Sequence, residues 1–134
     1  MNLNLHLRTL LFAVPLVLTV VAPLSAHHSF SAEFDDQKPI KVKGVITKVD
    51  WQNPHIWYYV DVKNADGTVT NWAFSGGAPS QLQRRGITKR VLELGATIEV
   101  QGSRAKDGTN NAFGSKVTFA DGRNVFTTGG EDKK

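Results

Sequence analysis

The sequence contains no cysteine among its 134 residues. The protein therefore has no disulfide bond, no thiolate metal ligand and no thiol nucleophile, and a bacterial lipid anchor on cysteine is excluded. Its stability must come from the packing of a hydrophobic core.

The common catalytic motifs are also missing. There is no Gly-x-Ser-x-Gly elbow and no His-Glu-x-x-His run. The acidic residues Glu33, Asp35 and Asp36 cluster near the start of the chain, where nothing in the pattern indicates the burial that catalytic carboxyl groups need. The sequence therefore favours a protein that is not an enzyme and has no catalytic residues.

The first residues are typical of a secretory signal peptide. Arg8 precedes an acid-free apolar run over residues 10–21, and small residues follow as far as Ala26. The run is shorter than the about 20 residues that a membrane span needs. We expect residues 1–26 to be removed during export, leaving a bacterial periplasmic or secreted protein without a membrane anchor. Export also argues against nucleic acid as a partner, although the formal net charge is +4.

The rest of the chain predicts one domain with a modest core. Residues 27–39 are expected to form an extended lead-in, pinned through Phe30 and Phe34 if it is pinned at all. Residues 40–126 are expected to fold, and residues 127–134, rich in glycine and charge, to form a disordered tail.

Alternating apolar residues predict β-strands throughout the folded part. We expect strands at 40–51, 56–63, 68–74, 97–104 and 112–119, with a small sixth strand at 124–126. In the second strand the side chains predicted to face the core are those of Ile56, Tyr58, Val60 and Val62. Gly44 lies where the alternation of the first strand changes phase, which suggests a bulge or a bend.

A short helix is expected between the third and fourth strands. Pro79 suits a first helical position and Gly86 the position just past the end. Thr88 is expected to cap one further turn. The order of elements predicts an all-β fold, a small OB-like antiparallel barrel of five to six strands with one short helix between strands three and four. Another small antiparallel barrel or a sandwich is the alternative.

The histidines could form a metal site. After cleavage, His27 would carry a free α-amine that can chelate a metal ion together with its own Nδ1. An imidazole from His55 would complete three nitrogens in a roughly planar set, which suits Cu(II). His28 offers a second Cu(II) mode, through the amine, the deprotonated amide and its imidazole. The pattern resembles the histidine-brace sites of exported copper proteins, but terminal histidines are often only solvated, and His55 could simply cap its turn or stack on Trp57.

Aromatic side chains around the second strand predict a binding surface. The residues are Trp51, Trp57 and Tyr59, with Asp61 beside them. Barrels of this type bind ligands on the face of strands two and three, by stacking rings on sugars or bases. For an exported protein the ligand would be a glycan, a peptide or a small aromatic molecule. The two tryptophans could instead cover the end of the barrel as core.

Four cations lie close together around the short helix, and they are Arg84, Arg85, Lys89 and Arg90. With Gly76 and Gly77 before the helix, an anion site is conceivable. Such a cluster is more often a solvated surface.

Five short motifs stand out along the chain beyond Ala26: His27-His28-Ser29-Phe30, Trp51-Gln52-Asn53-Pro54-His55, Asn71-Trp72-Ala73, Arg84-Arg85-Gly86 and Ala120-Asp121-Gly122-Arg123. Together they resemble a family of small exported bacterial proteins that is catalogued only as a domain of unknown function. The resemblance implies export and a single domain, and it implies no activity, ligand or catalytic residue.

The sequence thus favours a non-catalytic periplasmic binding or accessory protein with a copper site at His27, His28 and His55. The alternative is a structural or interaction module that grips a protein, peptide or glycan through its aromatic surface. A copper-dependent redox enzyme ranks third. Expected partners are a small ligand, a metal ion or another exported protein.

Overall fold

The computed structural model describes residues 30–127. The elements in chain order are α1 (Phe30–Glu33), β1 (Phe34–Asp50), β2 (Trp57–Lys63), β3 (Val69–Ser75), α2 (Pro79–Arg84), the 3-10 helix η1 (Lys89–Val91), β4 (Thr97–Ala105), β5 (Asn111–Phe119) and β6 (Asn124–Phe126). The expected signal peptide, the histidines His27 and His28 and the tail from Thr128 onward lie outside the described residues.

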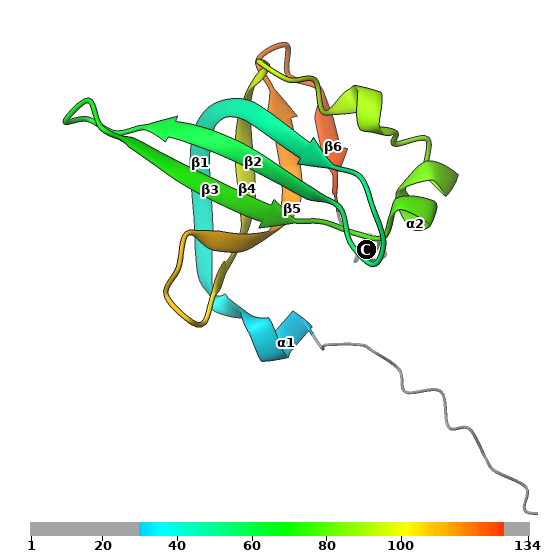
Figure 1. Ribbon diagram of the computed structural model, residues 1–134, viewed down its shortest axis with the longest axis horizontal. Coiled ribbons are helices and arrows are strands. Elements are labelled where there is room, and N and C mark those ends of the chain that lie inside the picture. The colour runs from blue at the N-terminus through cyan, green and yellow to red at the C-terminus, as the bar shows by residue number, and fades with distance from the viewer. Residues whose placement is uncertain (1–29, 128–134) are drawn as a thin grey trace, which may run out of the picture.

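The strands form one sheet that closes into a barrel (Figure 1). Antiparallel pairing gives the order β3-β2-β1-β4-β5-β6, and a parallel pairing joins β3 to β5 through three residue pairs, from Ala73–Asn111 to Ser75–Phe113. Strands β1 to β5 therefore form a closed ring, and β6 extends it as a hairpin partner of β5. This arrangement, with α2 between β3 and β4, confirms the predicted all-β, OB-like barrel.

The interior is filled by the residues that the alternation in β2 predicted. Ile56, Tyr58 and Val60 are fully buried, and Val62 packs against them at the edge of the core. The short helix α2 contributes Leu82, which is also fully buried. The helices are thus minor parts of the fold, and one of them supplies a core residue.

Gly44 in the first strand was expected to mark a bulge or a bend. The irregularity in the pairing of this strand with β2 lies between Ile46 and Lys48, so the expectation of a bulge at Gly44 was wrong. A Cβ atom at Gly44 would collide with the carbonyl oxygen of Asp61 and the side chain of Val60. Glycine is required there because the backbone of β2 crosses close to β1.

Both ends of the domain differ from the expectation. Residues 30–33 form a helical turn, and β1 begins at Phe34 rather than at Ile40, since Phe34 pairs with Ala105 of β4; its side chain is buried. At the other end Thr127, expected in the disordered tail, is fully buried. Thr88 precedes η1 but makes no side-chain cap, since its carbonyl oxygen alone accepts the bond from the Val91 backbone N–H.

The hairpin of β2 and β3 projects beyond the barrel (Figure 1). Its turn contains Asp66, whose carboxylate accepts bonds from the backbone N–H and the hydroxyl group of Thr68. Gly67 has a φ of 86°, the left-handed conformation expected for this Asp-Gly turn, and no atom lies within 4 Å of the position of a Cβ atom there. None of the helices in residues 30–127 is long and apolar enough to cross a membrane.

Thr127 fastens the last strand to the core. Its hydroxyl group donates to the Gly114 carbonyl oxygen at 2.6 Å and lies 3.2 Å from the Tyr58 hydroxyl oxygen. Burial raises the pKa of Tyr58 far above its usual range, so this phenol stays protonated and can donate to Thr127. The network joins β2, β5 and the end of the domain.

We predict that Thr127→Val destabilises the protein by about 1–3 kcal/mol, because a buried carbonyl and a buried phenol would lose their partner. Urea unfolding measures the free energy of unfolding. Thr97→Val, at an exposed position of β4, is the matched control and should change it by less than about 0.5 kcal/mol. Equal effects of the two substitutions would contradict the role given to Thr127.

Candidate functional site

His55 lies in the loop between β1 and β2, and its ring is oriented by one hydrogen bond. Nδ1 lies 3.0 Å from the Gly76 carbonyl oxygen. Because a carbonyl oxygen only accepts, Nδ1 carries the proton and donates it. Nε2, on the other side of the exposed ring, is then the basic nitrogen.

The loop is tied to the end of β3 by backbone bonds. The Ile56 N–H donates to the Gly77 carbonyl oxygen at 3.1 Å, and the Gly76 N–H donates to the Ile56 carbonyl oxygen at 2.9 Å. A Cβ atom at Gly76 would lie 2.8 Å from the Ile56 side chain and 2.8 Å from the Thr127 carbonyl oxygen, so the position needs glycine. The peptide bond between Asn53 and Pro54 in this loop is cis. This packing sets the position of the carbonyl group that orients His55.

The first described residues are held against the barrel. The Phe30 ring meets the Phe113 ring edge-on at 4.9 Å, and Phe34 lies 5.7 Å from the same ring. Lys106 adds two bonds, from Nζ to the Ser31 carbonyl oxygen at 2.6 Å and from its backbone N–H to the Glu33 carbonyl oxygen at 2.9 Å. Helix α1 is therefore fixed to β5 and to the turn that precedes it.

Phe113 also connects α1 with the His55 loop. It pairs with Ser75 across the parallel contact of β3 and β5, and Ser75 directly precedes Gly76, the residue that binds His55. A hollow of about 360 Å³ lies beside this contact and is lined by Ala32, Glu33, Phe34, Trp57, Ala105, Lys106, Asp107 and Asn111. The start of the described chain and Trp57, which lies two residues after His55, thus line one hollow.

The structure brings together three of the four residues predicted to form the aromatic surface. Trp57, Tyr59 and Asp61 alternate along β2 with the buried residues and are partly exposed. Asp61 accepts a bond from the Asn71 amide at 2.6 Å. Trp51 does not join them, because it packs against the hydrophobic core.

The sequence analysis missed a charged pair beside this surface. Lys48 Nζ lies 2.7 Å from an Asp50 carboxylate oxygen and 4.9 Å from the centre of the Tyr59 ring. The bond from Lys48 is the main cause that holds the pKa of Asp50 below its usual range, and the same bond raises the pKa of Lys48. The sequence contained a signal for this pair, because Lys48 and Asp50 are two residues apart and therefore lie on the same face of a strand.

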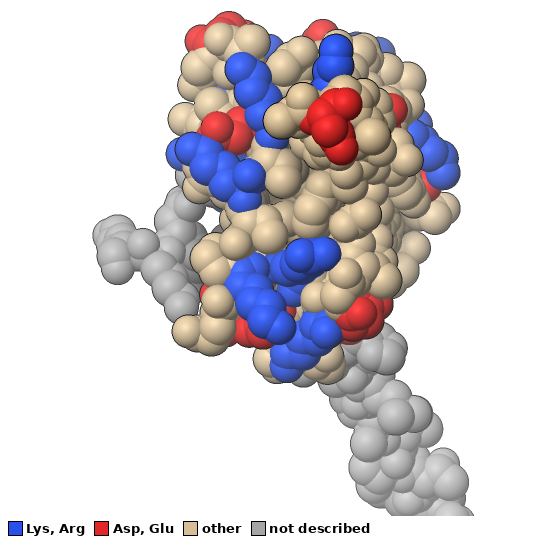
Figure 2. All heavy atoms as spheres, turned by 90° about the vertical axis from the view of Figure 1, so that its left-hand side faces the viewer, with Lys and Arg blue, Asp and Glu red and all other residues tan. Residues whose placement is uncertain are grey.

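The cationic cluster divides in the structure. Arg84 and Arg85 lie on and just after α2, whereas Lys89 and Arg90 belong to η1 and line a hollow of about 610 Å³. All four side chains are exposed. Arg84 and Arg85 do not line this hollow, so the four cations do not surround a single one. Figure 2 shows the opposite face, at the left of Figure 1, where Lys and Arg side chains form several separate groups with acidic side chains beside them.

The described residues contain no group of three His, Cys, Asp or Glu side chains that could hold a metal ion. His55 is the one histidine in this range, and the other two proposed ligands, His27 and His28, precede it. A site of the predicted composition thus needs the residues directly before α1.

The Lys48–Asp50 pair generates a prediction about pH. Because the folded pKa of Asp50 is lowered, the pair stabilises the fold above the ordinary carboxyl pKa of about 4 and loses this effect as the pH falls through the lowered value. In Lys48→Gln, an NMR titration should find the pKa of Asp50 raised towards about 4. Lys41→Gln, which removes the 3.0 Å pair with Glu99, should raise the pKa of Glu99 and leave that of Asp50 in place. An unchanged Asp50 in Lys48→Gln would refute the assignment.

Comparisons with known proteins give one result. No curated protein and no solved structure matches the chain. A protein-family model, described as a family of unknown function, matches residues 15–115, which is more than half of the sequence. The match includes the barrel as far as the middle of β5, the His55 loop and the residues directly before α1. The chain belongs to this family of unknown function, DUF6152.

Proposed function

We propose that the protein is an exported, non-catalytic binding or accessory module that holds one Cu(II) ion through His27 and His55. The observation that carries the proposal is the bond from His55 Nδ1 to the Gly76 carbonyl oxygen. Histidines that bind metals commonly donate their other ring N–H to a carbonyl or carboxylate oxygen, which fixes the tautomer and leaves the second ring nitrogen free to bind the metal. His55 Nε2 is such a nitrogen.

The anchoring of α1 gives further support. Phe30 is packed on Phe113, and Phe113 pairs with Ser75, the residue before the Gly76 that binds His55. Only His28 and Ser29 lie between His27 and Phe30, so the Cα atoms of His27 and Phe30 are at most about 10 Å apart. If export removes residues 1–26, the amine and Nδ1 of His27 together with Nε2 of His55 would give three nitrogens, a set that suits Cu(II). His28 would be a ligand in the second mode, through the amine, the amide and its own imidazole.

The carboxyl groups favour a non-catalytic role. Within residues 30–127, each carboxyl group with a shifted pKa has a lowered one: Asp50, Asp66, Glu99, Asp107 and Asp121. In every case the main cause is a hydrogen bond from a neighbouring side chain on the exposed surface. A general acid at neutral pH would need the opposite shift.

We predict that protein purified from a bacterial periplasm, with its N-terminus at His27 verified by intact mass, binds Cu(II) tightly and one-to-one. Binding should be lost in a form extended by Ala-Pro, because the α-amine is displaced and the proline has no amide N–H that could become a ligand. It should weaken by about tenfold or more in His55→Ala, and also with falling pH, because the nitrogens must be unprotonated to bind. Visible absorption and electron paramagnetic resonance follow the bound ion.

Gln52→Ala, a change at an exposed residue of the same loop, is the matched control and should bind as the unmodified protein does. Full affinity in His55→Ala would reduce the site to the terminal pair His27 and His28. Cleavage elsewhere than after Ala26, or no Cu(II) binding at all, would contradict the copper proposal. If the copper-bound protein catalysed several turnovers of an oxidation, it would be a copper-dependent redox enzyme instead.

A second candidate is an interaction module that grips a glycan, a peptide or another exported protein. It is favoured by the partial exposure of Trp57 and Tyr59 on one face of β2, with Trp57 lining the 360 Å³ hollow.

Under this candidate, Trp57→Ala should abolish the binding of oligosaccharides on a glycan array, and Tyr59→Ala should weaken it. His55→Ala should leave it unchanged, which separates the two functions. Trp51→Phe is the control, because Trp51 packs against the core. Glycan binding that survives Trp57→Ala would exclude the aromatic surface as the site.

A further inference from the structure

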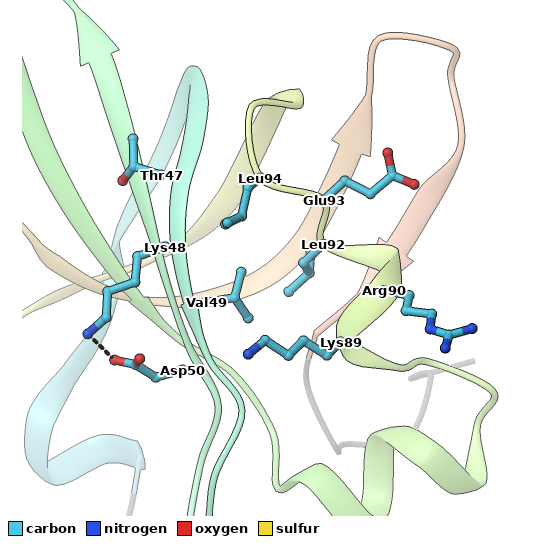
Figure 3. Close-up of a pocket in the computed structure, with 9 residues that line it drawn as sticks. All are labelled: Thr47, Lys48, Val49, Asp50, Lys89, Arg90, Leu92, Glu93 and Leu94. Carbon is cyan, nitrogen blue, oxygen red and sulfur yellow. Dashed lines mark hydrogen bonds and ion pairs between the residues drawn. The ribbon is translucent and has the colours of Figure 1, made fainter.

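A second hollow lies on another part of the barrel, between the end of β1 and the segment that follows η1 (Figure 3). Its volume is about 610 Å³, within the range of roughly 300–1,000 Å³ that small-molecule sites occupy. Val49 and Leu92 are buried at its base, and Leu94, 67% exposed, lies at its rim. It is an open hollow with an apolar base.

The hollow exists because two strands separate there. Pairing of β1 with β4 ends at Val45–Thr97, and Ile46 still bonds to the backbone of Gly95 and Ala96. Beyond that point, residues 48–50 pair with β2 on one side and have no strand partner on the other within residues 30–127. Unpaired backbone groups at a strand edge can bind polar groups of a ligand.

The charges around the hollow do not cancel. Lys48 is bonded to Asp50 at 2.7 Å. Lys89 extends its ammonium group into the hollow towards the same carboxylate and helps to lower the pKa of Asp50 (Figure 3). Two cations therefore face one carboxylate. Arg90 and Glu93 also line the rim, but their charged ends turn away from it (Figure 3).

We infer that this hollow binds an amphipathic monoanion, a carboxylate carried on an aliphatic or aromatic body. The carboxylate would bind the Lys89 ammonium group, and the body would cover Val49, Leu92 and Leu94. The single uncompensated positive charge disfavours a cation, and the nearby carboxylate of Asp50 disfavours an anion with several charges. The inference uses no histidine and is independent of the copper site.

The test uses decanoate as the probe, below its micelle concentration, with the protein purified from the periplasm. In a ¹H–¹⁵N NMR titration, saturable shifts are expected at the backbone amides of residues 47–50 and 89–94. Lys89→Gln should weaken the binding by about fivefold, the size expected for one exposed ion pair. Leu94→Ser should weaken it as well, because it removes apolar contact area.

Arg84→Gln is the matched control, since it removes a nearby exposed cation that does not line the hollow, and it should bind decanoate as the unmodified protein does. Acetate, which has the head group without the body, and decyltrimethylammonium, which has the body with the opposite charge, should both produce no saturable shifts at these amides. Equal weakening in Lys89→Gln and Arg84→Gln, binding of the cationic amphiphile, or no saturable binding of decanoate would each overturn the inference.

Discussion

The short parallel contact between β3 and β5 is the constraint on which the rest of the structure depends. Three residue pairs turn an antiparallel sheet into a closed ring. The same pairs place Ser75 beside Phe113, so that Gly76 presents its carbonyl oxygen to His55 while the Phe113 ring receives α1. Closure of the barrel and the anchoring of α1 next to the strand that leads to Gly76 thus both involve this one contact. A closed ring also leaves fewer free edges than an open sheet.

The two candidate sites arise in different ways. At His55 two loops pack closely, because Gly76 has no side chain to keep them apart and its carbonyl oxygen orients the His55 ring. At Lys89 the chain is spread apart, because β4 leaves β1 before β1 ends. The first geometry fixes one nitrogen with precision, which suits a metal ion. The second leaves room over an apolar base, which suits a flexible organic ligand.

Much of the barrel could be predicted from alternation and turn residues. The six strands, the helix at Pro79 and the buried face of β2 follow from local patterns. What escaped prediction depends on contacts between distant residues. From the sequence, Thr127 was expected to begin a disordered tail. The structure shows that it forms hydrogen bonds with Tyr58 and Gly114, which are distant in the sequence. Trp51 and Trp57 are alike in sequence and both are partly exposed, yet Trp51 packs against the core and Trp57 lines a hollow. The sequence also did not show that Lys48 lies over the Tyr59 ring, because this contact depends on the pairing of β1 with β2.

The projecting β2–β3 hairpin has a practical consequence. Its turn is held by bonds among its own residues, from Asn64 to Thr70, and Gly67 faces open space. It lines neither the hollow beside Trp57 nor the one beside Lys89. A fluorophore or an epitope tag attached at this tip would leave both candidate sites unobstructed. Since the natural chain has no cysteine, one cysteine introduced at the tip would be the only attachment point for thiol chemistry.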